Sequence, residues 1–195
     1  MAWIPGGMMA GMGEMKERML AGELYHAGDP EIVADEERCM LLVEQYNATG
    51  VVEHERRTAL LRELLAGFGE GTVIRPPVRF DRGYQTTVGD RTFVNYGAVI
   101  LDVGRVTIGD DVQIGPNLQI LTPTHPMEPE IRRTGLEAAA PITIGHTAWL
   151  GGGVIVCAGV TIGEETVIGA GSVVTREVPA RVFAAGNPCR VIRAL

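Results

Sequence analysis

The sequence contains a single lysine, Lys16, among its 195 residues. A lysine amine forms the Schiff bases of carbonyl and pyridoxal phosphate chemistry. One lysine close to the N-terminus therefore argues against enzymes of that kind. Aromatic residues make up only 5% of the chain, which is typical of a thin fold with little room for rings.

Basic charge, long apolar segments and paired cysteines are also scarce. The net charge of −7 and the pI near 5.1 argue against nucleic acid or an anionic membrane as a partner. No apolar run approaches 18 residues, so we expect no transmembrane helix. Residues 1–14 lack the basic and apolar regions of a signal peptide, and we expect a flexible leader there. Cys39, Cys157 and Cys189 are widely spaced and form no CxxC pair, which favours the reducing cytoplasm.

What the sequence does contain is an aliphatic residue at every sixth position, in three runs separated by a short insertion and a long one. A period of six is neither the 3.6 of a helix nor the 2 of a flat strand. It is the period of a hexapeptide β-helix, in which each unit forms one short strand and one corner. We therefore expect a mainly β fold whose core consists of these side chains. The twelve residues are Val88, Val94, Ile100, Ile108, Ile114, Ile120, Ile144, Leu150, Val156, Ile162, Ile168 and Val174.

The segment that precedes the repeats has the pattern of helices. Asp29 is a good N-cap with Pro30 at the first helical position, and a second helix should end before Gly67. Repeat stacks need such an end cover. We divide the chain into the leader, an N-terminal helical segment over 15–70 and a β-helix over 71–195.

Between Ile120 and Ile144 the pattern is lost, and prolines and charges replace it. This composition predicts a loop of about 122–141 that projects from the β-helix. Long loops on rigid scaffolds often carry function. The loop contains His125, an imidazole suited to general-base catalysis at neutral pH, although a solvated loop histidine is the more common case. The other three histidines show no metal-ligand spacing with it.

Other residues have both a structural and a functional interpretation. Asn95 stands where the repeat prefers a small residue, and its amide could stabilise an oxyanion or simply cap a turn. Cys157 occupies the same position in its unit, and we interpret it as a corner residue rather than a nucleophile. Gly151–Gly153 lacks a dinucleotide fingerprint, and it permits the close approach of a ligand or a neighbouring chain. The C-terminal arginines could bind phosphates or be ordinary surface residues. They are Arg176, Arg181, Arg190 and Arg193.

Several short motifs together resemble one family, the maltose, galactoside and nodulation acetyltransferases. The resemblance covers about residues 15–195, and its most specific element is the THP loop placed within the hexapeptides. The motifs are Met19–Tyr25 (MLAGELY), Tyr46–Thr49 (YNAT), Phe93–Tyr96 (FVNY), Leu101–Val103 (LDV), Thr122–Pro126 (TPTHP), Trp149–Gly152 (WLGG) and Ala185–Ile192 (AGNPCRVI).

The resemblance implies a left-handed parallel β-helix that works as a homotrimer with active sites between subunits. It implies acetyl-CoA as the donor, the hydroxyl of a sugar as the acceptor, and no metal. By position, His125 would be the general base and Asn95 would assist at the tetrahedral intermediate, so the catalytic interpretation of both is favoured. The backbone N–H near Gly152 would face the thioester oxygen.

The resemblance also assigns the two substrates to individual residues. Asp81 and Asp102 would bind sugar hydroxyls. Val103 stands where galactoside enzymes carry an acidic residue. The motif Leu101–Val103 is therefore closer to that of the maltose enzymes. His26 and Ala27 stand where the family often has an acidic residue that reaches the sugar. The residues expected to bind acetyl-CoA are Trp149, Gly152, Ala170, Thr175, Arg176, Arg190 and Arg193.

The sequence therefore predicts an acetyl-CoA-dependent O-acetyltransferase that acts on a maltose-, glucose- or galactoside-type sugar. Three alternatives remain at this point. They are an acyltransferase of the same fold with a non-sugar acceptor, a zinc protein resembling γ-carbonic anhydrase, and a non-catalytic scaffold.

Overall fold

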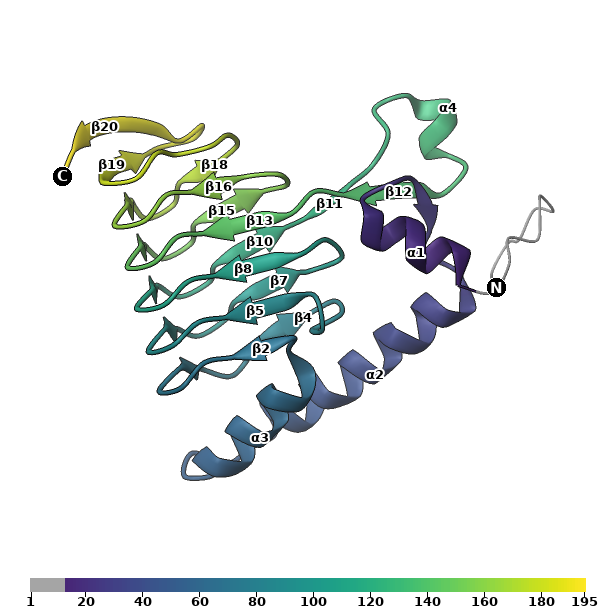
Figure 1. Cartoon of the computed structure of the whole chain (residues 1–195), viewed down its shortest axis with the longest axis horizontal. Coiled ribbons are helices and arrows are strands. Elements are labelled where there is room, and N and C mark those ends of the chain that lie inside the picture. The colour runs from purple at the N-terminus through teal and green to yellow at the C-terminus, as the bar shows by residue number, and fades with distance from the viewer. Residues whose placement is uncertain (1–12) are drawn as a thin grey trace.

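The chain is described by a computed structural model that covers residues 13–195, and these form a stack of β-coils with helices at one end (Figure 1). The predicted leader lies outside the described residues except for Gly13 and Glu14, and Glu14 is the first residue of helix α1.

Each coil of the stack passes through three parallel sheets in turn. The first sheet contains β2 (Gly67–Phe68), β5 (Thr86–Val88), β8 (Val106–Ile108), β13 (Ile142–Ile144) and β16 (Thr161–Ile162). The second contains β3 (Val73–Ile74), β6 (Phe93–Val94), β9 (Gln113–Ile114), β14 (Trp149–Leu150), β17 (Val167–Ile168), β19 (Val182–Ala185) and β20 (Arg190–Ala194). The third contains β4 (Arg79–Phe80), β7 (Val99–Leu101), β10 (Gln119–Leu121), β15 (Ile155–Cys157) and β18 (Val173–Val174). Only β20 pairs antiparallel within these sheets.

The twelve aliphatic residues of the six-residue period form the core, as predicted. Each of them is at most 2% exposed. The strand register stacks them in columns, so that Val94 lies beside Ile114 and Leu150 beside Ile168. Burial of each such side chain contributes roughly 1.5–3 kcal/mol before conformational entropy offsets it. The parallel β-helix expected from the period is confirmed.

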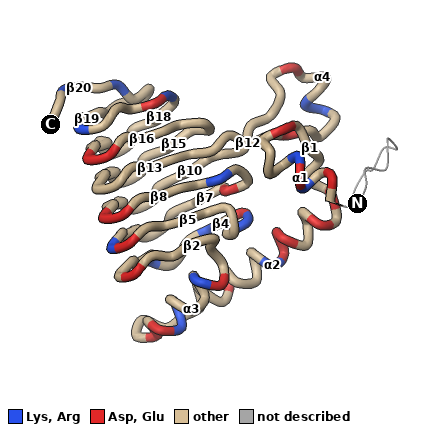
Figure 2. Tube along the Cα trace, in the orientation of Figure 1, with Lys and Arg blue, Asp and Glu red and all other residues tan. Residues whose placement is uncertain are grey.

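The three corners of the coils differ in composition and form three edges of the stack. The glycine edge, between the second and third sheets, comprises residues 75–78, 95–98, 115–118, 151–154 and 169–172. The loop edge, between the third and first sheets, comprises residues 81–85, 102–105, 122–141, 158–160 and 175–177. The charged edge lies between the first and second sheets and carries acidic and basic residues on successive coils (Figure 2). There, Arg91 contacts Asp111 at 2.7 Å.

Close stacking explains the small residues of the glycine edge. A Cβ on Gly115 would lie 2.5 Å from the Gly152 nitrogen, and a Cβ on Gly151 would lie 2.5 Å from the Ala170 nitrogen. Both distances are shorter than van der Waals contact, so only glycine lets neighbouring coils approach this closely.

Three helices precede the stack: α1 (Glu14–Ala21), α2 (Pro30–Asn47) and α3 (His54–Leu64). The Asp29 side chain accepts the Glu31 N–H at 3.0 Å, which confirms its expected role as the α2 N-cap. Residues of α2 and α3 join the core and cover the first coil, as an end cap should. Helix α3 ends at Leu64, and β2 already belongs to the stack, four residues before the predicted boundary at 71. Between residues 13 and 195, no helix has the length and apolar character to span a membrane.

The segment 122–141, which we call the arm, projects from the loop edge as predicted, and it has structure of its own. It contains β11 (Pro123–Thr124), the short helix α4 (Pro129–Arg132) and β12 (Leu136–Ala139). Strand β12 pairs antiparallel with β11 and with β1 (Tyr25–His26), which lies between α1 and α2. The arm is therefore attached to the N-terminal segment by a small three-stranded sheet (Figure 1).

Candidate active site

His125 lies on the arm, directly after β11, with a side chain that is 56% exposed. Its Nε2 atom is 3.9 Å from an oxygen of Glu137 on β12. The antiparallel pairing of β11 and β12 brings the two residues together. An exposed imidazole beside a carboxylate can take up a proton, and the carboxylate favours the cation that results.

Glu137 is held in place by Tyr25, which belongs to the N-terminal segment. The two residues are directly paired between β12 and β1. The Tyr25 side chain is fully buried, and its hydroxyl donates a hydrogen bond to Oε1 of Glu137. Burial, and next the bond to Glu137, raise the pKa of Tyr25 above its ordinary value, so the phenol keeps its proton. The second oxygen of Glu137 is thus directed to His125.

Asp81 follows β4 on the loop edge and is half-buried. Burial is the main reason that the pKa of its carboxyl is raised, and the negative charges of Asp102 and Glu137 contribute in the same direction. The charge of Arg82 opposes this shift. Asp81, predicted to bind a sugar hydroxyl, therefore lies on the same side of the stack as the arm.

Asp102, also predicted to bind the sugar, has a different position. Its side chain is fully buried. One carboxylate oxygen accepts the backbone N–H groups of Asp81 and Arg82 at 3.1 and 2.9 Å, and the other accepts the Thr86 hydroxyl at 2.7 Å. Because its oxygens are engaged inside the protein, Asp102 supports the corner that carries Asp81. The role of Asp102 as a direct ligand of the sugar stays a prediction.

Sequence reasoning missed Glu137 and Arg82. Arg82 is 3% exposed, and its guanidinium lies 3.5 Å from Glu36 of α2 and 3.2 Å from the Asp81 carbonyl oxygen. Glu137 is 112 residues from Tyr25 in the sequence. No local pattern marks either residue, because the pairing of β1 with β12 and the packing of α2 create their environments.

The second group of predicted residues lies on the glycine edge. Asn95 follows β6, and its side-chain oxygen accepts the Tyr96 N–H at 2.9 Å. Gly152 and Ala170 occupy equivalent corners of later coils. A Cβ placed on Gly153 would have no atom within 4 Å, so this part of the edge is bare backbone next to open space.

Trp149 borders the glycine edge from the second sheet and is 57% exposed. It pairs with Val167, which pairs with Phe183, which in turn pairs with Arg193 of β20. Arg190 lies on the same exposed strand. The indole and two arginines therefore lie along one sheet, beginning beside Gly152.

Thr175 and Arg176 follow β18 and lie on the loop edge, the edge that also carries His125.

Asn95 precedes β7 and His125 follows β10, and these two strands are parallel and in register. The two predicted catalytic residues thus lie at opposite edges of the third sheet. A single chain does not bring them together.

Within residues 13–195, the structure contains neither a cluster of metal ligands nor a disulfide. No three or more His, Cys, Asp or Glu side chains in this range are grouped so that they could hold a metal ion. Cys39, Cys157 and Cys189 are free thiols. His54 and His146 lie on different elements, at the start of α3 and on the charged edge.

Comparison with known proteins gives matches along nearly the whole chain. Residues 18–69 match the maltose acetyltransferase hexapeptide capping motif, and residues 141–176 match the bacterial transferase hexapeptide (six repeats). Nodulation protein L of Rhizobium leguminosarum bv. viciae is 52% identical over 176 residues, which are 90% of this chain and 93% of that protein.

Two solved structures are similar in both sequence and fold. A maltose O-acetyltransferase from Clostridium difficile 630 has a TM-score of 0.92 and 43% identity, with 93% of this chain and 97% of that chain covered. A galactoside acetyltransferase in complex with coenzyme A has a TM-score of 0.89 and 40% identity, with 92% and 90% covered.

Proposed function

The chain belongs to the family of maltose, galactoside and nodulation acetyltransferases, and we propose that His125 is the general base of its reaction. The protein is an acetyl-CoA-dependent O-acetyltransferase that acts on a sugar. The observation that carries the proposed mechanism is the arrangement of His125 and Glu137 on the arm with Tyr25 of β1.

On the acceptor side, His125 removes the proton from the sugar hydroxyl as the hydroxyl oxygen attacks the carbonyl carbon of the acetyl thioester. The C–S bond then breaks, and coenzyme A leaves as the thiol with the proton that the imidazolium returns. Glu137, 3.9 Å away, favours the imidazolium that forms. Tyr25 holds the Glu137 carboxylate in position. Asp81 accepts hydrogen bonds from neighbouring hydroxyls of the sugar, on a backbone that Asp102 fixes.

On the donor side, acetyl-CoA supplies an activated acetyl group as a thioester. The bare backbone at Gly153, next to Gly152, leaves room for an extended chain, and the exposed Trp149 offers an apolar face beside it. Ala170, Thr175 and Arg176 would line the path of the pantetheine arm, and Arg190 and Arg193 would bind its phosphates. The Asn95 side chain and the Gly152 N–H would stabilise negative charge that develops on the thioester oxygen.

The complete site requires a second subunit, and we propose the homotrimer that the family resemblance implies. His125, Thr175 and Arg176 lie on the loop edge, whereas Asn95, Trp149 and Gly152 lie on or beside the glycine edge. A closed ring in which the loop edge of each subunit meets the glycine edge of the next would complete three equal sites.

The acceptor that the residues around Asp81 favour is a glucose- or maltose-type sugar. Val103, which stands where galactoside enzymes carry an acid, is 2% exposed and packs with Met19, Tyr25 and Ile32. The side chain therefore offers no carboxylate to a galactoside. The three free cysteines fit a reducing compartment, and we place the enzyme in the cytoplasm.

The test is coenzyme A release with glucose, maltose and galactosides as acceptors. His125→Ala should lower turnover on the order of 10²–10⁴-fold, because it removes the base. His146→Ala is a matched control, since His146 is 63% exposed on the charged edge, and it should retain wild-type turnover. Near-normal turnover in His125→Ala would contradict the mechanism.

A further inference from the structure

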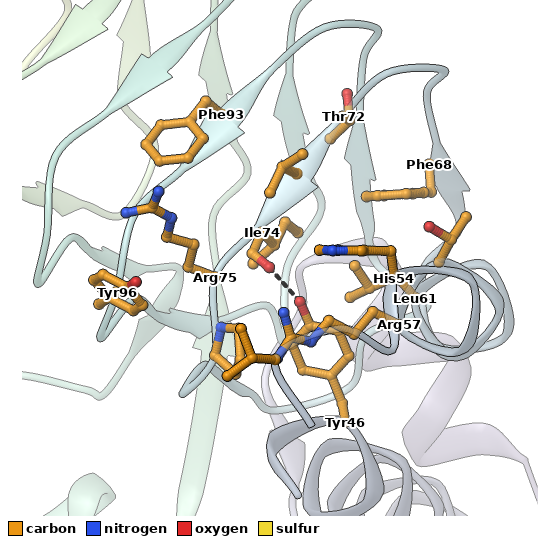
Figure 3. Close-up of a pocket in the computed structure, with 14 residues that line it drawn as sticks. Tyr46, His54, Arg57, Leu61, Phe68, Thr72, Ile74, Arg75, Phe93 and Tyr96 are labelled. Carbon is orange, nitrogen blue, oxygen red and sulfur yellow. Dashed lines mark hydrogen bonds between the residues drawn. The ribbon is translucent and has the colours of Figure 1, made fainter. Parts of the chain in front are cut away.

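A groove of about 610 Å³ lies at the first coils of the stack, away from the arm. One wall is the outer face of β3 and β6, and the other is α3 with the turn that precedes it (Figure 3). The mechanism above does not use this groove, although three of its lining residues, Tyr46, Phe93 and Tyr96, belong to the sequence motifs.

Arg75 is the most informative residue of the groove. Its guanidinium carbon lies 5.0 Å from the ring centre of Phe93 and 4.8 Å from that of Tyr96. The two aromatic faces hold the cation without using its N–H groups. Among the described residues, no hydrogen bond or ion pair to the Arg75 side chain occurs. A fixed guanidinium with unused donors is suited to binding an oxyanion.

The other residues that line the groove also favour the binding of an anion. His54 and Arg57 lie on the opposite wall (Figure 3), and no aspartate or glutamate lines the groove. Arg57 is fixed by a hydrogen bond from its Nε to the Thr49 hydroxyl at 2.7 Å. In a chain of net charge −7, a groove lined only by basic and neutral residues is a local positive region.

The groove also has apolar surface for the body of a ligand. Val51 is 82% exposed, and Val73 and Tyr96 are about half exposed. Together with Phe93, these side chains offer flat and aliphatic faces next to the cation. The lining therefore suits an anionic group, a carboxylate or a phosphate, attached to an apolar or aromatic body.

The position of the groove connects it with the catalytic residues. The Arg75 backbone N–H donates to the Val94 carbonyl at 2.9 Å, so Arg75 lies one coil below Asn95 on the glycine edge. Tyr96 follows Asn95 directly. Arg75 is also the only charged residue in the five corners of the glycine edge.

We propose that this groove is an acceptor subsite that binds an anionic, apolar substituent of the sugar. The inference rests on the proposed function, because the acetylated hydroxyl must lie near Asn95. The reactive end of the acceptor then occupies the catalytic site, and its substituent extends past Tyr96 to Arg75.

The experiment compares phenyl and 4-carboxyphenyl β-glucosides as acceptors of the trimeric enzyme, with the β-galactosides as a second pair. The wild type should have a kcat/KM roughly 10-fold higher for the carboxylated member, as expected for a hydrogen bond to a charged group. Arg75→Gln should abolish this ratio. Arg91→Gln removes the same charge from the charged edge, where Arg91 pairs with Asp111, and it should keep the ratio.

Three outcomes would overturn the subsite. An equal ratio in the wild type and Arg75→Gln shows that Arg75 does not select the anion. Benzoate that inhibits without competing with the glucoside shows a separate regulatory site. Benzoate that binds the wild type and Arg75→Gln equally in calorimetry shows that the groove is not the anion site, and this measurement needs no turnover. Absence of acetyl transfer to every sugar would instead reject the proposed function.

Discussion

At the scale of single residues, Glu137 is placed to orient His125, the proposed base of the reaction. It connects a buried tyrosine to an exposed histidine across two strands that are distant in sequence. Its negative charge stabilises His125 once the imidazole has taken up a proton, because opposite charges about 4 Å apart attract.

Glu137→Gln should therefore lower kcat about 10-fold, or about 1.4 kcal/mol, while the KM for the sugar changes little. The glutamine keeps the size and can still accept the Tyr25 hydrogen bond, so the arm should remain in place. Steady-state kinetics of the variant, with Tyr25→Phe alongside, measure the effect. A rise in KM at unchanged kcat would show that Glu137 binds the sugar instead of positioning the base.

At the scale of elements, Asp29 at the N-terminus of α2 should contribute to stability and not to catalysis. Its side chain caps the helix, and an N-cap change to alanine costs about 1 kcal/mol. Asp29→Ala should lower the free energy of unfolding by that amount in denaturant titration, with kcat/KM unchanged. Asp29→Ser keeps a capping oxygen and should restore most of the stability. A large loss of kcat/KM in both variants would place Asp29 in the acceptor site.

The elements also show what a sequence can predict about this fold. The stack was predictable because each inward residue is specified by its own coil, from Val88 to Val174, and each aliphatic is followed by a corner. The α2 cap was predictable for the same local reason. The pairing of β1 with β12 was not, because two residues of β1 carry no periodic signal. The environments of Tyr25, Glu137 and Asp102 depend on that pairing and on buried hydrogen bonds between distant corners.

At the scale of the whole molecule, the β-helix separates the predicted site into two halves. The repeat fixes the glycine edge and the loop edge at opposite sides of the third sheet. His125 belongs to one edge and Asn95 to the other. A rigid stack cannot bend to join them, and the proposed homotrimer would complete the site between subunits.

Mixed trimers of two inactive variants test this arrangement. His125→Ala chains keep a normal glycine edge, and Asn95→Ala chains keep a normal arm. In a ring with random mixing of equal amounts, an interface is intact when an Asn95→Ala chain supplies the arm and a His125→Ala chain supplies the glycine edge. About one quarter of the interfaces meet this condition. The unmixed trimers have no such interface, and every trimer that carries both tags has one of its three interfaces intact. Co-expressed chains with different affinity tags should therefore recover about one third of wild-type turnover in trimers purified through both tags, if each variant alone is nearly inactive. Turnover no higher than the average of the two parent variants would show that His125 and Asn95 do not share a site across the interface.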